Sequence, residues 1–258
     1  MSYTFSSSTI NAGSNAKTVK GDDEYVTAVM YLAPHNLSGF NVCAMAETAH
    51  CIDPCLNLSG RGKFTKVQNA RIAKTLRFFN DRTKFMEDLI RDINKFVKWC
   101  AKKKVKPAIR LNGTSDIRWE SVYYDTKNIF EHFPKVQFYD YTKITNRRRA
   151  KLHSNYHLTW SYSEPDDKYA AKYSEALLNG MNIAVVFRDK DKIPSEFLGC
   201  SVVDGDKDDL RFLDPKGVVV SLYAKGPAKK DQSGFVIDVK EKQDGTTNTT
   251  GGPALEVA

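Results

Sequence analysis

Residues 25–55 read YVTAVMYLAPHNLSGFNVCAMAETAHCIDPC and place a strand-like segment directly before a cysteine-rich loop. The first nine residues, Tyr25–Ala33, are mostly apolar and rich in β-formers, and they end at Pro34. A short apolar run of this kind, closed by a proline, is typical of a strand that is buried on both faces. We therefore expect an α/β domain whose first buried strand brings the cysteine loop to one edge of the sheet.

Helix and strand patterns alternate along the rest of the chain. Residues 65–104 predict two helices that are broken near Asn80 and Asp81, and the second helix has an apolar stripe that includes Cys100. Further strands are predicted at 108–111, 136–141, 156–162, 182–187, 199–203 and 218–222, with helices at 125–132 and 167–178 and a basic turn or helix at 147–151. This order predicts an α/β fold with a mostly parallel sheet, built as a partial (β/α) barrel with helices outside. A smaller flavodoxin-like sheet is the alternative.

Composition favours a single soluble domain. The chain has 258 residues, of which 41% are hydrophobic and 27% charged, and one core can serve that length. We expect the domain to span residues 23–240, between polar and flexible termini at 1–22 and 241–258. No apolar run approaches the roughly 18 residues of a membrane span, and residues 1–24 lack a secretory pattern. These features predict a cytoplasmic protein without a membrane partner.

Three of the five cysteines, Cys43, Cys51 and Cys55, lie within thirteen residues. An odd number of cysteines in a chain of this size does not indicate a disulfide framework, and clustered thiols in a reducing compartment are more often metal ligands. Three thiolates can hold a [4Fe–4S] cluster with one iron left open, or a zinc ion with His50 as the fourth ligand. The alternative for Cys43 is a plain core position.

The placement of this loop is similar to that of radical S-adenosylmethionine (SAM) enzymes, in which three cluster cysteines follow the first strand of a partial barrel. The spacing differs, because seven and then three residues separate the cysteines here, whereas that superfamily usually has three and then two. The resemblance implies an iron–sulfur enzyme that binds SAM, and we expect such an enzyme to act on a nucleotide or nucleic-acid related substrate. The alternative is a zinc-containing accessory protein that binds nucleic acid or a host partner without catalysis.

The strand predicted at 108–111 runs into the polar turn Asn112, Gly113, Thr114, Ser115 and Asp116. Because the carboxyl ends of parallel strands share one rim, this turn should face the cysteines and could hold the ribose or methionine part of a nucleoside cofactor. The turn could equally be an Asx turn that caps the next segment. Weaker candidates for the same rim are Asp140, Trp160, Ser161, Arg188, Asp204 and Asp206.

The formal net charge of +8 is concentrated. Residues 63–106 contain fourteen Lys and Arg against four Asp and Glu, a local net charge of +10. With the run Arg147, Arg148 and Arg149, this segment predicts contact with nucleic acid or a nucleotide, although solvated helix and loop surfaces explain it as well. No P-loop, HExxH, nucleophile elbow or complete GxGxxG is present, which argues against ATPases, zinc proteases, α/β-hydrolases and Rossmann dehydrogenases.

Three motifs in order resemble the bacteriophage family called gene product 88. They are CIDPCLNLSGRG at 51–62, VQNARIAKT at 67–75 and RLNGTSDIRWE at 110–120. The resemblance covers roughly residues 33–215. It implies a phage-encoded protein that works in the cytoplasm of the infected bacterium, and it implies no particular chemistry.

Overall fold

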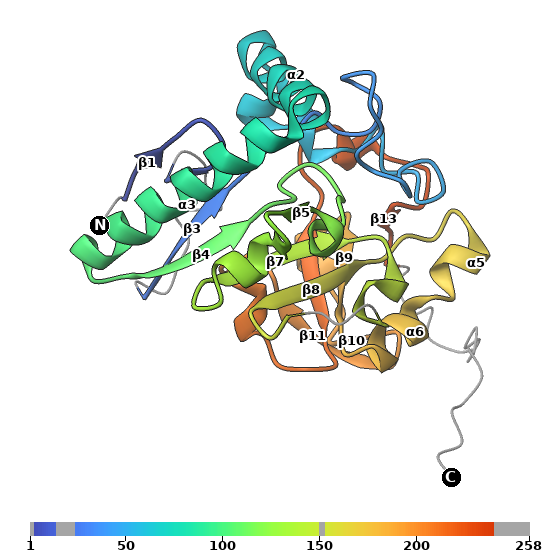
Figure 1. Cartoon of the computed structure of the whole chain (residues 1–258). Coiled ribbons are helices and arrows are strands. Elements are labelled where there is room, and N and C mark those ends of the chain that lie inside the picture. Colours follow the sequence, from blue (N-terminus) through green and yellow to red (C-terminus); the bar gives the residue numbers. More distant parts are fainter. Residues whose placement is uncertain (1–2, 14–23, 150–152, 240–258) are drawn as a thin grey trace, which may run out of the picture.

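The computed structural model describes residues 3–13, 24–149 and 153–239. Its main feature is one large, mostly parallel sheet (Figure 1). In spatial order its strands are β1 (Phe5–Ser6), β2 (Asn11–Ala12), β3 (Tyr25–Val29), β4 (Lys106–Arg110), β7 (Gln137–Thr142), β8 (Tyr156–Ser161), β9 (Asn182–Phe187), β12 (Val219–Tyr223), β11 (Cys200–Asp204) and β10 (Glu196–Phe197), while β13 (Val236–Ile237) also pairs with β9.

All pairings from β3 across to β11 are parallel, and the antiparallel ones lie at the two margins of the sheet. The predicted mixed α/β fold with a mostly parallel sheet is confirmed. From β3 to β9 the parallel strands also follow their order along the chain. Their carboxyl ends therefore share one edge, which is the edge where loops distant in sequence become neighbours.

Helices cover one face of this sheet. The longest are α2 (Thr65–Asn80) and α3 (Arg82–Lys103), and α4 (Ile129–His132), α5 (Asp167–Ala170) and α6 (Tyr173–Leu178) are short. The Asp81 side chain accepts a hydrogen bond from the Lys84 amide (3.1 Å) and so caps α3, which explains the predicted break. The predicted stripe on α3 is buried at Phe85, Leu89, Ile93, Phe96 and Cys100.

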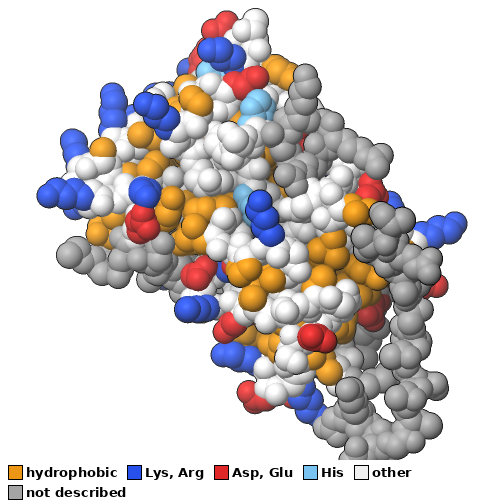
Figure 2. Space-filling model, turned by 90° about the horizontal axis from the view of Figure 1, so that it is seen from below, with side chains coloured by type: hydrophobic (Ala, Val, Ile, Leu, Met, Phe, Trp, Pro, Cys, Tyr) orange, Lys and Arg blue, Asp and Glu red, His pale blue; other side chains and the backbone are white. Residues whose placement is uncertain are grey.

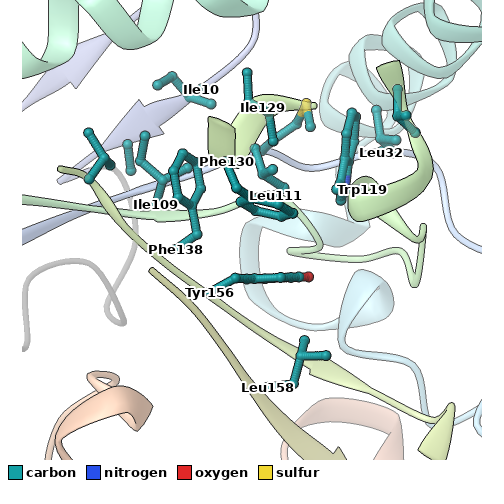
Figure 3. Packing of buried hydrophobic residues seen from close by; sticks show 14 of the residues in the cluster. Ile10, Leu32, Ile109, Leu111, Trp119, Ile129, Phe130, Phe138, Tyr156 and Leu158 are labelled. Carbon is teal, nitrogen blue, oxygen red and sulfur yellow. The ribbon is translucent and has the colours of Figure 1, made fainter. Parts of the chain in front are cut away.

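The core lies between these helices and the sheet. Ile109 and Leu111 on one strand and Phe138 on the next point toward Phe130 and Trp119 (Figure 3). Because successive side chains of a strand alternate between faces, Arg110 and Tyr139 belong to the second face, away from α3. A second cluster, Ala224, Ala228 and Val236, packs near the carboxyl edge.

The second face is polar where the segment after β11 covers it. Arg110 Nη1 donates to Asp209 Oδ2 at 2.8 Å, and the hydroxyl of Tyr139 donates to the same oxygen at 3.3 Å. The hydroxyl groups of Tyr139 and Thr27 are 2.9 Å apart. These contacts fix the segment against the second face, where Arg110 at the carboxyl end of β4 also borders a cavity.

Two predicted helices are shorter than expected. Asp125 and Thr126 have positive φ angles of 48° and 65° and form the turn between β5 (Tyr123–Tyr124) and β6 (Lys127–Asn128). The helix predicted at 125–132 therefore begins only at Ile129, where Asn128 and Glu131 form a capping box. The helix predicted at 167–178 is interrupted between α5 and α6.

The amino-terminal segment also differs from expectation where it is described. Residues 5–12 form the antiparallel β1–β2 hairpin, and β2 pairs with β3. Asp92 on α3 accepts hydrogen bonds from the Ser8 hydroxyl and from the amide and hydroxyl of Thr9, and these bonds tie the hairpin to the core. The remainder of the predicted flexible termini lies outside the described residues. None of the described helices has the length and apolar character that a membrane span needs.

Candidate functional site

A cavity of about 240 Å³ opens at the carboxyl edge of the parallel strands. Its floor is the second face of the sheet, and its walls are the cysteine loop, the turn at 112–116 and the segment 225–235. The floor residues are Arg110, Tyr141, Ser161, Ala184, Val186 and Leu222, from the ends of β4, β7, β8, β9 and β12. Five parallel strands therefore contribute to one cavity.

Cys43, Cys51 and Cys55 all line this cavity. Burial raises the pKa of each thiol, and for Cys43 to about 12. The three sulfurs also influence one another electrostatically, since negative charge on Cys51 raises the pKa of both Cys43 and Cys55. These thiols hold their protons near neutral pH, and a bound cation would be required to stabilise them as thiolates.

The predicted metal site stays a prediction. In residues 3–13, 24–149 and 153–239, no group of three or more His, Cys, Asp or Glu side chains is arranged to hold a metal ion. His50, the proposed fourth zinc ligand, is exposed in a left-handed backbone conformation (φ 47°), and it is not among the residues that line the cavity. The donors that the cavity offers are therefore the three thiols alone or with Asp116.

All five residues of the turn at 112–116 line the same cavity as the cysteines, and the Cys43 thiol lies 3.9 Å from the Thr114 carbonyl oxygen. The side chain of Asn112 is used inside the turn, because its Oδ1 accepts from the Ser115 hydroxyl (2.8 Å) and the Ile117 amide (3.0 Å). Gly113 is required where it packs on β3, since a Cβ would lie 2.6 Å from the Met30 carbonyl oxygen. These bonds tie Asn112 to Ser115 and Ile117, whereas an Asx turn has a bond from the amide two residues on. Both the Asx turn and the cofactor role of the turn at 112–116 stay predictions.

The carboxylate of Asp116 is held from two sides. Oδ1 accepts from Arg147 Nη1 at 3.0 Å, and Oδ2 accepts from the Lys143 amide at 2.8 Å. Burial raises the pKa of Asp116, while the positive charge of Arg147 acts in the opposite direction. The carboxylate is consequently fixed in the cavity wall, where it adds negative charge next to Cys43 and Cys51.

The position of Arg147 does not fit the prediction that this residue contacts nucleic acid or a nucleotide. Its side chain is fully buried, and it donates to both oxygens of Glu120 at 3.0 and 2.7 Å in addition to Asp116. A buried guanidinium that is neutralised by two carboxylates has no charge to offer to a phosphate. The side chains of Arg148 and Arg149 lie outside the described residues, so that part of the prediction stays open.

Lys143 is a charged cavity residue that the sequence interpretation missed, as it missed Lys225, Tyr223 and Phe235. It follows β7 directly, and its ammonium group donates to the carbonyl oxygen and hydroxyl of Ser161 at 3.2 and 3.0 Å. Burial lowers the pKa of Lys143, and the negative charge that Cys51 and Asp116 carry when deprotonated acts in the opposite direction. The available signal was its position at the carboxyl end of a buried strand, which is where polar side chains of parallel sheets become functional.

The weaker rim candidates separate in the structure. Ser161 lines the cavity, but Trp160 lies in the hydrophobic core. Arg188 lies outside the cavity and holds the segment 225–235 in place through the carbonyl oxygens of Lys229 and Asp231. The remaining residues are also structural: Asp204 caps the amide of Asp206, and Asp206 pairs with Lys225.

Asp140 points to the helix side of the sheet. Its Oδ1 accepts from the Asn112 amide (2.8 Å) and its Oδ2 accepts from the Tyr156 hydroxyl (3.0 Å). Burial is the main cause that raises the pKa of Asp140 to about 7. Asp140 therefore holds the backbone of the turn at 112–116 from the helix side of the sheet and does not reach the cavity.

This shift predicts a pH dependence of stability that Asp140→Asn removes. The folded carboxyl keeps its proton up to about pH 7, whereas the unfolded one loses it near 3.8. Folding stability should therefore fall as the pH rises through this window, by about 4 kcal/mol for this group over the whole window, of which roughly 3 kcal/mol falls above pH 5. Urea unfolding at pH 5 and pH 8 measures the difference. Asp125→Asn, at an exposed turn, should keep the wild-type difference, and equal differences in all three proteins would contradict the assignment.

The basic segment 63–106 is partly neutralised within the fold. Asp88 lies within ion-pair distance of Lys84, Arg77 and Arg91. Lys95, Lys98 and Lys102 are exposed along α3. On the face of the molecule that Figure 2 shows, some Lys and Arg side chains lie beside Asp and Glu side chains and others stand apart from them. Contact between this segment and nucleic acid stays a prediction.

One comparison with known proteins identifies the family. A family model described as "Gene product 88" matches residues 5–239, which includes the cysteine loop, the turn at 112–116 and every wall of the cavity. Neither the curated proteins nor the solved structures give a significant match. Because the match extends over most of the sequence, the chain belongs to the bacteriophage gene product 88 family.

Proposed function

We propose that this protein is an iron–sulfur enzyme of the radical SAM type, with Cys43, Cys51 and Cys55 as the cluster ligands. The observation that carries the proposal is the shared cavity: three thiols from one loop and the turn at 112–116 line it together. The loop follows β3, the first strand of the parallel series. From β3 to β9 the parallel strands follow chain order with polar loops at their carboxyl edge, and this part of the sheet supports a partial (β/α) barrel, while β12 and β11 follow β9 in reversed order.

The donor set fits a cluster in its number and chemistry. Thiolates are the preferred protein ligands of iron–sulfur clusters, and three of them leave one iron open. A cluster also needs less convergence than a single ion does, because each thiolate binds a different iron. When bound, such a cluster with SAM supplies the one-electron chemistry that removes a hydrogen atom from a substrate.

The chain's own residues would serve this chemistry by position and by exclusion of water. The backbone of the turn at 112–116 is held by Asp140 and by Met30, which follows β3, so it presents fixed groups beside the thiols. Lys143 and Asp116 place one positive and one negative charge beside them. Apolar lining from Met45, Ala184 and Val186 would keep water away from a reactive centre.

Anaerobic purification followed by an absorption spectrum and metal analysis tests this proposal. Brown protein with broad absorption near roughly 400 nm, as iron–thiolate centres show, and with iron and sulfide in equal amounts supports it. Colourless protein with stoichiometric zinc would instead favour the accessory protein with a structural zinc site. Protein that is free of both metals after reconstitution with iron and sulfide would exclude the enzyme proposal.

A further inference from the structure

The charged residues that line the cavity are unequally compensated. The lining includes four charged residues. Three of these form ion pairs within the protein: Arg110 with Asp209, Asp116 with Arg147, and Lys225 with Asp206. The fourth is Lys143. Across the part of the chain that the structure describes, its ammonium group forms no ion pair and donates only to Ser161.

The surroundings of Lys143 suit a bound anion. An ammonium group has three N–H donors, and the carbonyl oxygen and hydroxyl of Ser161 occupy two of them. The ammonium nitrogen also lies 4.9 Å from the ring centroid of Phe235 and 5.6 Å from that of Tyr169. Two aromatic rings replace much of its water. Asp116 acts on the ammonium group electrostatically but forms no ion pair with it, so an acidic ligand would supply the direct partner for the third N–H.

An apolar strip begins next to this cation. Ser161 and Ala184 are Cα partners on β8 and β9, and Val186 and Leu222 are Cα partners on β9 and β12. All four residues line the cavity floor. The strip therefore runs from Ser161 on β8 across β9 to β12, away from the side of the cavity where Cys43 contacts the carbonyl oxygen of Thr114. The cavity consequently has one polar end and one apolar end.

We propose that the cavity binds a small organic acid, with its acidic group on Lys143 and the Ser161 hydroxyl and its apolar body across Ala184, Val186 and Leu222. This inference rests on the proposed function only in treating the acid as the substrate, because binding itself requires no cluster. A carboxylate and a phosphate monoester share the chemistry that Lys143 recognises. A neutral molecule of the same shape lacks the charge and should bind poorly.

Calorimetric titration of the full-length protein with hexanoate, hexyl phosphate and hexan-1-ol tests this. At least one of the two acids should bind about tenfold or more tightly than the alcohol, since a charge-assisted hydrogen bond contributes at least that factor. Whichever acid binds more tightly identifies the acidic group as carboxylate or phosphate. Lys143→Met should abolish the preference for acid over alcohol, and Ser161→Ala should reduce it by a smaller factor.

Lys168→Met is the matched control, because Lys168 is an exposed lysine on α5 outside the cavity; it should keep the wild-type preference. Acids that bind no better than hexan-1-ol, or a preference that survives in Lys143→Met, would overturn the proposal. If Lys143→Met does not fold, the preference for acid over alcohol is measured in Ser161→Ala and Lys143→Arg instead. An unchanged preference in Ser161→Ala then overturns the proposal. Metal analysis of the same preparations tests the iron–sulfur proposal separately, so failure of one proposal is distinguishable from failure of the other.

Discussion

Cys51→Ala protein, purified without oxygen, is expected to lose nearly all its iron and its absorption near roughly 400 nm. Negative charge on Cys51 raises the pKa of both Cys43 and Cys55, so Cys51 interacts with each of the other two thiols. Removal of one of three thiolates leaves two ligands, which is too few to retain a cluster against free thiols in solution. Cys43→Ala and Cys55→Ala should show the same loss, measured as iron and sulfide per chain.

The other two cysteines provide matched controls. Cys100 is fully buried on α3 and Cys200 is partly buried on β11, and neither lines the cavity. Cys100→Ala and Cys200→Ala should keep the full metal content, and Cys100→Ala should cost about 1–2 kcal/mol of stability through lost packing. Equal metal loss in all five variants would show that the loop at 43–55 is not the site.

The sequence predicts those parts of the fold that local periodicity determines. Apolar runs such as Asn182–Phe187 form buried strands because both faces of a parallel strand are covered, and the stripe on α3 has helical spacing. Local pattern failed where a backbone conformation or a distant contact decides. The positive φ angles at Asp125 and Thr126 have no apolar signature, and the β1–β2 hairpin depends on Asp92, more than eighty residues away.

The candidate site was predictable to a similar extent. The parallel order alone brings the cysteine loop and the turn at 112–116 to one cavity, and this expectation needs no knowledge of side-chain contacts. The partner that a charged side chain binds could not be predicted in this way. Nothing in the run at 147–149 distinguishes a buried arginine from an exposed one, because Asp116 and Glu120 come from a separate segment that only the fold brings close. Lys143 was missed for the same reason.

Arg147→Met is expected to be among the most destabilising single substitutions in this protein. The guanidinium is fully buried and binds Glu120 through two hydrogen bonds and Asp116 through one. Methionine fills much of the volume but leaves two buried carboxylates without their cation. Removal of one partner of a buried ion pair costs about 3–5 kcal/mol, and urea unfolding measures that loss. Arg118→Met is the control, since Arg118 is exposed and bonds only to Asn146 among the described side chains; it should change stability by less than about 0.5 kcal/mol.

A second substitution separates lost charge compensation from lost packing. If the cost of Arg147→Met arises from the unpaired carboxylates, then Glu120→Gln in the Arg147→Met background should recover part of the stability, because a neutral amide is cheaper to bury than an unpaired charge. If the cost arises from packing, the double variant should be no more stable than Arg147→Met alone. Asp116 lines the cavity, and without Arg147 it should take up a proton more readily. The same substitution should therefore weaken the negative charge beside Cys43 and Cys51, which links the buried network to the candidate site.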